Sequence, residues 1–277
     1  MSVDEKKTAI ITYVDRNNEE NIKEDFLKSL FEVSKYKGHV IVLDYGMSED
    51  ISKEIQDCYP VKTYRCNKEI DIFVDRYKDI SKIIYSLPEQ VSTIATMDSG
   101  DIWFQKNLNE MFEIGVNEIR TVIENRVWDK DEWSLKCINS LGLQEKQRVI
   151  KILSGTKVRN SGVIIGSREL IRSLFENVYD DIFLCGYSFF GIDQIFVNYE
   201  IAKLNAEKRR SLKDKFNYVL VSNAKDFEII DNVVYKKNGE QIVVVHNAGG
   251  NWRILGRPFL NKWSNPEQYA IENVKRF

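Results

Sequence analysis

The chain has 277 residues and contains 40 lysines and arginines against 42 aspartates and glutamates, which gives a formal net charge of -2. A nearly neutral chain lacks the basic surface of an unselective nucleic-acid binder, so we exclude DNA and RNA as main partners. The length suits one full hydrophobic core, no repeat is visible, and no apolar run is long enough for an integral membrane segment, so we expect residues 1–277 to form a single domain.

Strand and helix patterns alternate through the first half of the chain. Residues 8–14 form an apolar, β-branched run that predicts a strand, and apolar residues follow at helical spacing at Ile22, Phe26 and Leu30. Further strands are expected at 39–43, 61–66 and 92–97, and further helices at 49–57 and around Ile80, Ile83, Ile84 and Leu87. This alternation predicts an α/β fold with a mostly parallel central sheet flanked by helices, and with ligands at the carboxyl ends of the strands.

The strand at 92–97 runs into an acidic turn, Asp98-Ser99-Gly100-Asp101. We expect Gly100 to let the backbone bend, so that the carboxylates of Asp98 and Asp101 converge on one hard cation. An ordinary turn is the competing interpretation, because aspartate, serine and glycine all favour turns for local reasons. The chain then resumes as a short helix pattern over residues 108–112.

The middle of the chain is less regular. Residues 118–123 look like a strand, whereas the polar, tryptophan-bearing segment 124–157 is interpreted as a lid or an insertion. A strand at 158–166 is entered through a polar corner, and Ser167 is expected to cap the helix that follows.

The last third of the chain contains three further features. Asp193 lies at the start of a helix, where it suits the N-cap position. Late strands are expected at 227–235 and 241–245, and the second of them leads into His246 and a glycine-rich turn. Residues 256–277 are interpreted as a C-terminal tail.

The cysteines indicate a reducing compartment. They lack the paired short spacings of a zinc site and are too sparse for a disulfide framework, so we expect reduced thiols in a cytoplasmic protein. A bridge between the first two is the lower-ranked alternative. The four are Cys58, Cys66, Cys137 and Cys185.

Four motifs, in their order along the chain, resemble those of GT-A-fold glycosyltransferases, a Rossmann-like fold, and in particular of glycosyltransferase family 8, which includes glycogenin and bacterial lipopolysaccharide galactosyltransferases. The resemblance covers roughly residues 8–255. The D-x-D, N-x-G, D-Q and H-x-x-G motifs of that family are similar to Asp98–Asp101, Asn160–Gly162, Asp193–Gln194 and His246–Gly249. The chain departs from the pattern in two respects: its acids are three positions apart rather than two, and no lysine follows the last motif.

The resemblance implies a divalent metal site. Asp101 and His246 would be direct ligands of Mn²⁺ or Mg²⁺, and Asp98 would either complete the ligand set or hold the donor ribose and sugar. The competing interpretation of His246 is a strand-end histidine that hydrogen-bonds to the backbone. His39, the other histidine, is expected to be structural.

The resemblance also implies a nucleotide-sugar donor, most simply a UDP-hexose. Tyr13 would stack on the base or serve as a core aromatic, and one of Arg76, Lys78 and Lys82 would face the sugar or phosphate. Hydrogen bonds to the donor, and countercharge for its diphosphate, would come from Asp98, Asn160, Gly162, Gly249 and Arg253, with Gly250 and Lys262 as further candidates.

Catalysis would centre on Asp193 and Gln194, with Gln194 nearest the anomeric carbon and Asp193 fixing the identity of the sugar. The resemblance implies transfer with retention to an unknown carbohydrate or other hydroxyl acceptor, and we favour a front-face mechanism over a covalent intermediate. The segment 124–157 would then lie on the acceptor side.

Two other functions compete with a hexosyltransferase. One is a catalytically silent carbohydrate-binding or scaffold protein of the same fold, an alternative that the irregular acid spacing leaves open. The other is a sugar nucleotidyltransferase, but the acidic segment 15–20 lacks the glycine-rich, basic loop that a triphosphate would require.

Overall fold

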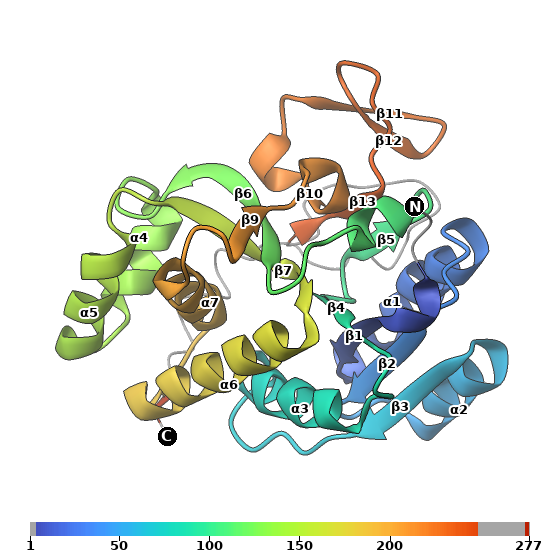
Figure 1. Cartoon of the computed structure of the whole chain (residues 1–277), viewed down its shortest axis with the longest axis horizontal. Coiled ribbons are helices and arrows are strands. Elements are labelled where there is room, and N and C mark those ends of the chain that lie inside the picture. The colour runs from blue at the N-terminus through green and yellow to red at the C-terminus, as the bar shows by residue number, and fades with distance from the viewer. Residues whose placement is uncertain (1–3, 249–274, 277) are drawn as a thin grey trace.

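A computed structural model describes residues 4–248 and 275–276 of the chain. Its centre is a seven-stranded sheet with the order β3-β2-β1-β4-β7-β6-β9 (Figure 1). Only β7 runs antiparallel to its neighbours, so the sheet is mostly parallel, as predicted. The strands are β1 (Thr8–Val14), β2 (His39–Asp44), β3 (Val61–Arg65), β4 (Thr93–Met97), β6 (Ile119–Val127), β7 (Lys157–Ser167) and β9 (Arg209–Ser211).

Helices cover both faces of this sheet. The segment after β1 begins as α1 (Glu19–Asn21) and continues with π-type hydrogen bonding through η3 (Ile22–Leu27) and η4 (Ser29–Val33). The longer helices are α2 (Glu49–Cys58), α3 (Ile72–Ser86), α4 (Glu132–Asn139), α5 (Leu143–Leu153), α6 (Arg168–Cys185) and α7 (Ile192–Lys203). Short 3-10 turns occur at η1 (Glu5–Lys7), η2 (Arg16–Asn18), η5 (Asn109–Phe112), η6 (Asp214–Phe216) and η7 (Val221–Asn223).

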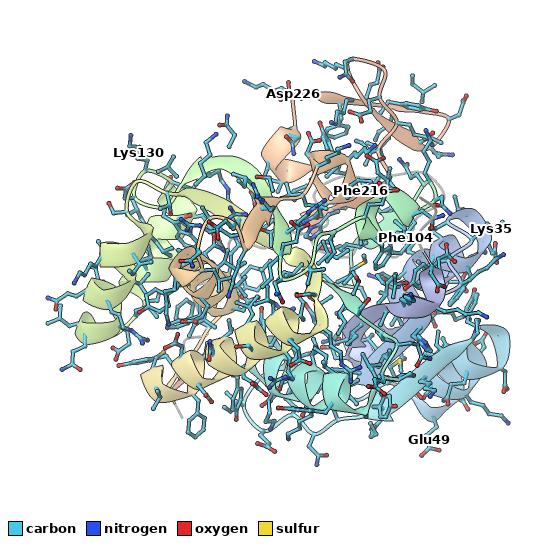
Figure 2. All side chains as sticks on the ribbon, viewed as in Figure 1. Lys35, Glu49, Phe104, Lys130, Phe216 and Asp226 are labelled. Atoms are coloured by element: carbon cyan, nitrogen blue, oxygen red, sulfur yellow. The ribbon has the colours of Figure 1, made fainter. Side chains whose placement is uncertain are left out.

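Alternate residues of the central strands enter two different cores. In β1, Ala9 and Ile11 pack into the core beneath α3, α6 and α7, whereas Ile10 and Val14 pack into the core beneath α2 and the helical segment after β1. Burial on both faces explains why the strands are continuous apolar runs in the sequence. Figure 1 shows α3 and α6 side by side along one flank, and Figure 2 shows Phe104 and Phe216 inside the molecule, with Lys35, Glu49 and Lys130 at its periphery.

A smaller sheet lies beside the central one. It joins β10 (Tyr218–Val219), β13 (Val244–His246) and β5 (Ile102–Phe104), so it pairs a late segment of the chain with the segment that follows the acidic turn. A hairpin of β11 (Phe227–Ile230) and β12 (Val233–Lys236) projects near it in Figure 1. At the opposite end, β8 (Tyr187–Ser188) pairs with β14 (Lys275–Arg276).

The order of the strands reverses between β1 and β4. The chain proceeds from β1 through β2 to β3 on one side of β1, and β4 then returns to the other side. Ligands of open α/β sheets bind beyond the carboxyl ends of the strands at such a reversal. Tyr13 and Asp98 lie at these two strand ends, so the fold places them where a ligand is expected.

Several local predictions are confirmed and others need correction. The four predicted strands of the first half are present, and the segment 124–157, interpreted from the sequence as a lid or an insertion, contains the end of β6 and the helices α4 and α5. The predicted strand at 227–235 is instead a hairpin, because Asp231 and Asn232 adopt positive φ angles and reverse the chain. Ser167 occupies the N-cap of α6, although its side chain makes no capping hydrogen bond.

The prediction that Asp193 is the N-cap of its helix is wrong. Gly191 holds that position with a φ of 94°, and Asp193 lies inside the first turn of α7. All four cysteines are free thiols, so the alternative bridge between Cys58 and Cys66 is not formed. Among the described residues, none of the helices combines the length and apolar character that crossing a membrane requires.

Candidate active site

Hydrogen bonds hold the acidic turn against the ends of two neighbouring strands. The backbone N–H of Asp98 donates to the carbonyl of Gly162 in β7 over 2.9 Å. The Ser99 hydroxyl donates to the carbonyl of Tyr13 at the end of β1 over 2.6 Å. The turn is therefore fixed from both sides of β4.

Gly100 is not in the left-handed region of backbone conformation, so the predicted need for unusual flexibility is not the reason for a glycine there. Instead, the helical segment after β1 approaches it closely. The Asn21 amide donates to the Gly100 carbonyl over 2.5 Å, and a Cβ added at Gly100 would lie 2.7 Å from Oδ1 of Asn18.

Pairing of β13 with β5 brings His246 to the acidic turn. His246 lies opposite Ile102 in this antiparallel pair, and the backbone N–H of Asn247 donates to the carbonyl of Asp101 over 2.9 Å. The imidazole Nε2 is 3.5 Å from Oδ1 of Asp101 and 4.0 Å from Oδ2 of Asp98. Residues that are far apart in the sequence thus meet at one point.

The three side chains fit a divalent cation. One ligand atom from each of Asp98, Asp101 and His246 lies within 4.8 Å of the others, and His246 is buried while both acids are partly open. Carboxylate oxygens together with an imidazole nitrogen suit Mn²⁺, and carboxylate oxygens also suit Mg²⁺. The predicted convergence of these three residues is therefore present in the structure.

Charge and burial shift the pKa values of this cluster. Burial raises the pKa of Asp98 to about 7, against the opposing effects of Arg76 and His246. Burial disfavours the imidazolium of His246, but the carboxylates of Asp101 and Asp98 outweigh it, so the pKa of His246 is raised.

Arg76 is the buried cation of the site. Its guanidinium donates to Oδ1 of Asp98 over 3.1 Å and forms an ion pair with Asp193, and its side chain is only 5% exposed. It also lies over the Tyr13 ring, 4.3 Å from the ring centroid, and the Tyr13 hydroxyl donates to Asp98. Burial opposes its charge, yet Tyr77, Asp193 and Asp98 together raise the pKa of Arg76.

The other two basic candidates, Lys78 and Lys82, contact acids outside the site. The ammonium of Lys78 pairs with Glu69 at 2.7 Å, and the side chain of Lys82 is 67% exposed beside Asp79. Among the three residues that the sequence offered, Arg76 is the one that reaches the acidic turn.

The N-x-G and D-Q motifs also lie at this site. The Gly162 position faces His246, since a Cβ added there would lie 2.4 Å from Cε1 of the imidazole and 2.9 Å from Oδ2 of Asp98. Gln194 accepts a hydrogen bond from the Ser161 hydroxyl over 3.2 Å and is largely buried. Gly249, Gly250, Arg253 and Lys262 lie outside the described residues.

Sequence reasoning missed two buried residues behind the site. Asn217 contacts His246, and Glu124 contacts Asn160. In the sequence, Asn217 lies between Phe216 and Tyr218, and Glu124 directly follows the strand that was expected to end at residue 123. A polar residue between two aromatic ones is the signal that the sequence offers for Asn217, whereas Glu124, which precedes Asn125 and Arg126, carries no such signal.

Among solved structures, the chain is similar to the galactosyltransferase LgtC in complex with donor and acceptor sugar analogues. The TM-score is 0.60 at 15% sequence identity, over 94% of this chain and 98% of that chain. An active-site mutant of LgtC with glutamate in place of glutamine gives a TM-score of 0.58 at 15% identity, over 87% of each chain. No protein-family model and no curated protein matches the sequence. The chain therefore has the GT-A fold that its motifs predicted.

We expect Gly162→Ala to destabilise the protein by about 1–3 kcal/mol, because the added methyl group overpacks His246 and Asp98. Urea unfolding measures the change. Gly115→Ala is the matched control, since the atoms nearest to its added Cβ are those of the Glu118 carboxyl, at 3.3 Å or more. Equal stability of the two variants would contradict this packing.

We expect Arg76→Met to cost about 3–5 kcal/mol of unfolding free energy, because it leaves two acids of the site without their buried counterion. Lys82→Met on the same helix is the control and changes stability by less than about 0.5 kcal/mol, since Lys82 is exposed. Similar losses in both variants would show that Arg76 does not neutralise the site.

Proposed function

We propose that this protein is a glycosyltransferase that moves a hexose from a nucleoside-diphosphate sugar, with UDP-hexose as the donor, to a hydroxyl acceptor. We further propose transfer with retention, dependence on Mn²⁺ or Mg²⁺, and a cytoplasmic location. The observation that carries the proposal is the convergence of Asp98, Asp101 and His246 beyond the carboxyl end of β4. The GT-A fold supports it by analogy.

The metal would be held by the two acids and the imidazole. A divalent cation supplies countercharge for the departing diphosphate, which is the group that develops negative charge as the glycosidic bond breaks. The protein itself holds the ligand atoms in position. Arg76 fixes Oδ1 of Asp98, so Oδ2 is left facing His246.

Asp193 and Gln194 are proposed to bind the transferred sugar. Both are buried on the first turn of α7, and the carboxylate of Asp193 is held by Arg76. Gln194 accepts from Ser161, and the amide group of its side chain retains N–H donors that can bind a sugar hydroxyl or the anomeric oxygen. The glutamine in the active site of the similar galactosyltransferase supports this role.

Tyr13 is proposed to bind the uracil ring. Arg76 covers one face of the Tyr13 ring, and the opposite face is the one proposed for the base. The acceptor is proposed to bind beside α4, in the segment 124–157, where the indole of Trp133 lies 5.4 Å from the guanidinium of Arg126.

We expect UDP to bind more tightly in the presence of Mn²⁺, as measured by isothermal titration. Asp101→Ala and His246→Ala each remove a proposed ligand, so the affinity in Mn²⁺ falls by about tenfold or more. His39→Ala is the matched control, because the only other histidine lies at the amino end of β2 and its loss leaves binding unchanged.

Two outcomes would contradict the proposal. Failure of UDP to bind with any divalent cation would overturn the uridine and metal assignments together. Metal-dependent binding of UDP without hydrolysis or transfer of any UDP-hexose would instead favour the silent scaffold.

We expect the affinity for Mn²⁺ to rise with pH through the neutral range. The pKa of Asp98 is raised to about 7 and that of His246 is also raised, so protons compete with the cation for both ligands at lower pH. Binding is expected to be about tenfold weaker at pH 6 than at pH 8, for one displaced proton with a pKa near 7. Titration of Mn²⁺ followed by its free-ion EPR signal measures this, and a flat profile would contradict it.

A further inference from the structure

A chain of buried side chains runs away from the site behind His246. The Nδ1 atom of the imidazole lies 2.9 Å from Oδ1 of Asn217. The Asn217 amide nitrogen donates to Oδ1 of Asn160 over 2.8 Å, and the Asn160 amide nitrogen donates to Oε1 of Glu124 over 3.0 Å. All four residues are at most 6% exposed.

The direction of these hydrogen bonds is fixed at the far end of the chain. A carboxylate only accepts hydrogen bonds, so the amide nitrogen of Asn160 must face Glu124. The other oxygen of Glu124 is held by Arg126, at 2.9 and 2.8 Å, and by the Ser222 hydroxyl at 2.5 Å. Three donors thus hold this carboxylate group in place.

The backbone fixes the same direction a second time. The N–H of Gly162 donates to Oδ1 of Asn160 over 2.9 Å, and a backbone N–H cannot reverse its role. Because that oxygen faces Asn217, Asn217 must present its amide nitrogen to it. The Asn217 oxygen is consequently left facing His246.

The imidazole is therefore constrained as well. An oxygen opposite Nδ1 requires a proton on Nδ1, and in the neutral ring this leaves Nε2 with a free lone pair. Nε2 is the atom that faces Asp101 and Asp98, at 3.5 and 4.0 Å. In the opposite tautomer, Nδ1 and the Asn217 oxygen would be two buried acceptors facing each other with no proton between them. The proton on Nε2 would then point at the cation.

We propose that Glu124, Asn160 and Asn217 are positioning residues that hold His246 in the Nδ1–H tautomer, so that its Nε2 binds a divalent cation. This inference rests on the proposed function. The polar chain links β6 and β7 of the central sheet to β13 of the smaller sheet. Residues of the central sheet therefore determine the tautomer of His246, which lies on the smaller sheet.

NMR of ring ¹⁵N-labelled histidine tests the tautomer directly, without metal. The chain has only two histidines, so His39→Gln leaves the single signal of His246. At a pH above the imidazole titration, we expect the Nδ1–H tautomer. A predominant Nε2–H tautomer would overturn the proposal, and this measurement needs no change in the polar chain itself.

Substitution of Asn217 tests the link between tautomer and metal. Asn217→Leu removes the acceptor, so we expect a mixture of tautomers and Mn²⁺ affinity reduced by about 10- to 100-fold. Asn217→Asp keeps an oxygen opposite Nδ1 and is expected to retain the Nδ1–H tautomer. An unchanged tautomer and affinity in Asn217→Leu would overturn the proposal.

The two proposals fail in different ways. An Nδ1–H tautomer that depends on Asn217, in a protein that does not bind Mn²⁺, would refute the proposed metal site and still support control of the imidazole by the polar chain. Mn²⁺ binding by a protein whose His246 is Nε2–H would refute only the polar chain.

Discussion

The structure of the site depends on the compensation of buried negative charge. Three carboxylates, from Asp98, Asp101 and Asp193, gather at the carboxyl edge of the sheet, where water is partly excluded. Carboxylates that lie this close raise each other's pKa unless cations accompany them. Arg76 is the permanent cation, and its planar guanidinium contacts Asp98 through one nitrogen and Asp193 through another. The carboxylate of Asp101 and the second oxygen of Asp98 instead face Nε2 of the His246 imidazole, where the proposed metal ion would bind.

Two sheets must meet for this compensation to occur. Asp98 follows β4 of the central sheet, whereas His246 ends β13 of the smaller sheet, and β5 connects them because it begins directly after Asp101. The antiparallel pairing of β5 with β13 thus brings His246 next to the two acids of the turn. Buried polar groups then tie the sheets together behind it, and each such group needs its partners, because an unpaired polar group in a core is costly.

Much of this arrangement could be predicted from the sequence. The strands of the first half are continuous β-branched runs, so their pattern is strong, and the acidic turn is recognisable because it ends one of them. The polar chain was not predictable in the same way. Asn217 and Glu124 are separated by more than ninety residues, and only the folded sheet brings them to the two sides of Asn160. Segment 124–157 was also unclear, since α4 and α5 are short helices whose packing against α7 is set by tertiary contacts.

The turn accommodates a spacing between its two acids that is wider than in a D-x-D motif. A D-x-D motif has one residue between its acids, whereas Ser99 and Gly100 both lie between Asp98 and Asp101 here. Both intervening residues are anchored, Ser99 through its hydroxyl to β1 and Gly100 through its carbonyl to Asn21. With this longer loop, one carboxylate oxygen of each acid still lies within 4.8 Å of the other. Because Oδ1 of Asp98 is occupied by Arg76 and Tyr13, its Oδ2 is the oxygen that faces the imidazole, and it is the one that would bind the proposed metal ion.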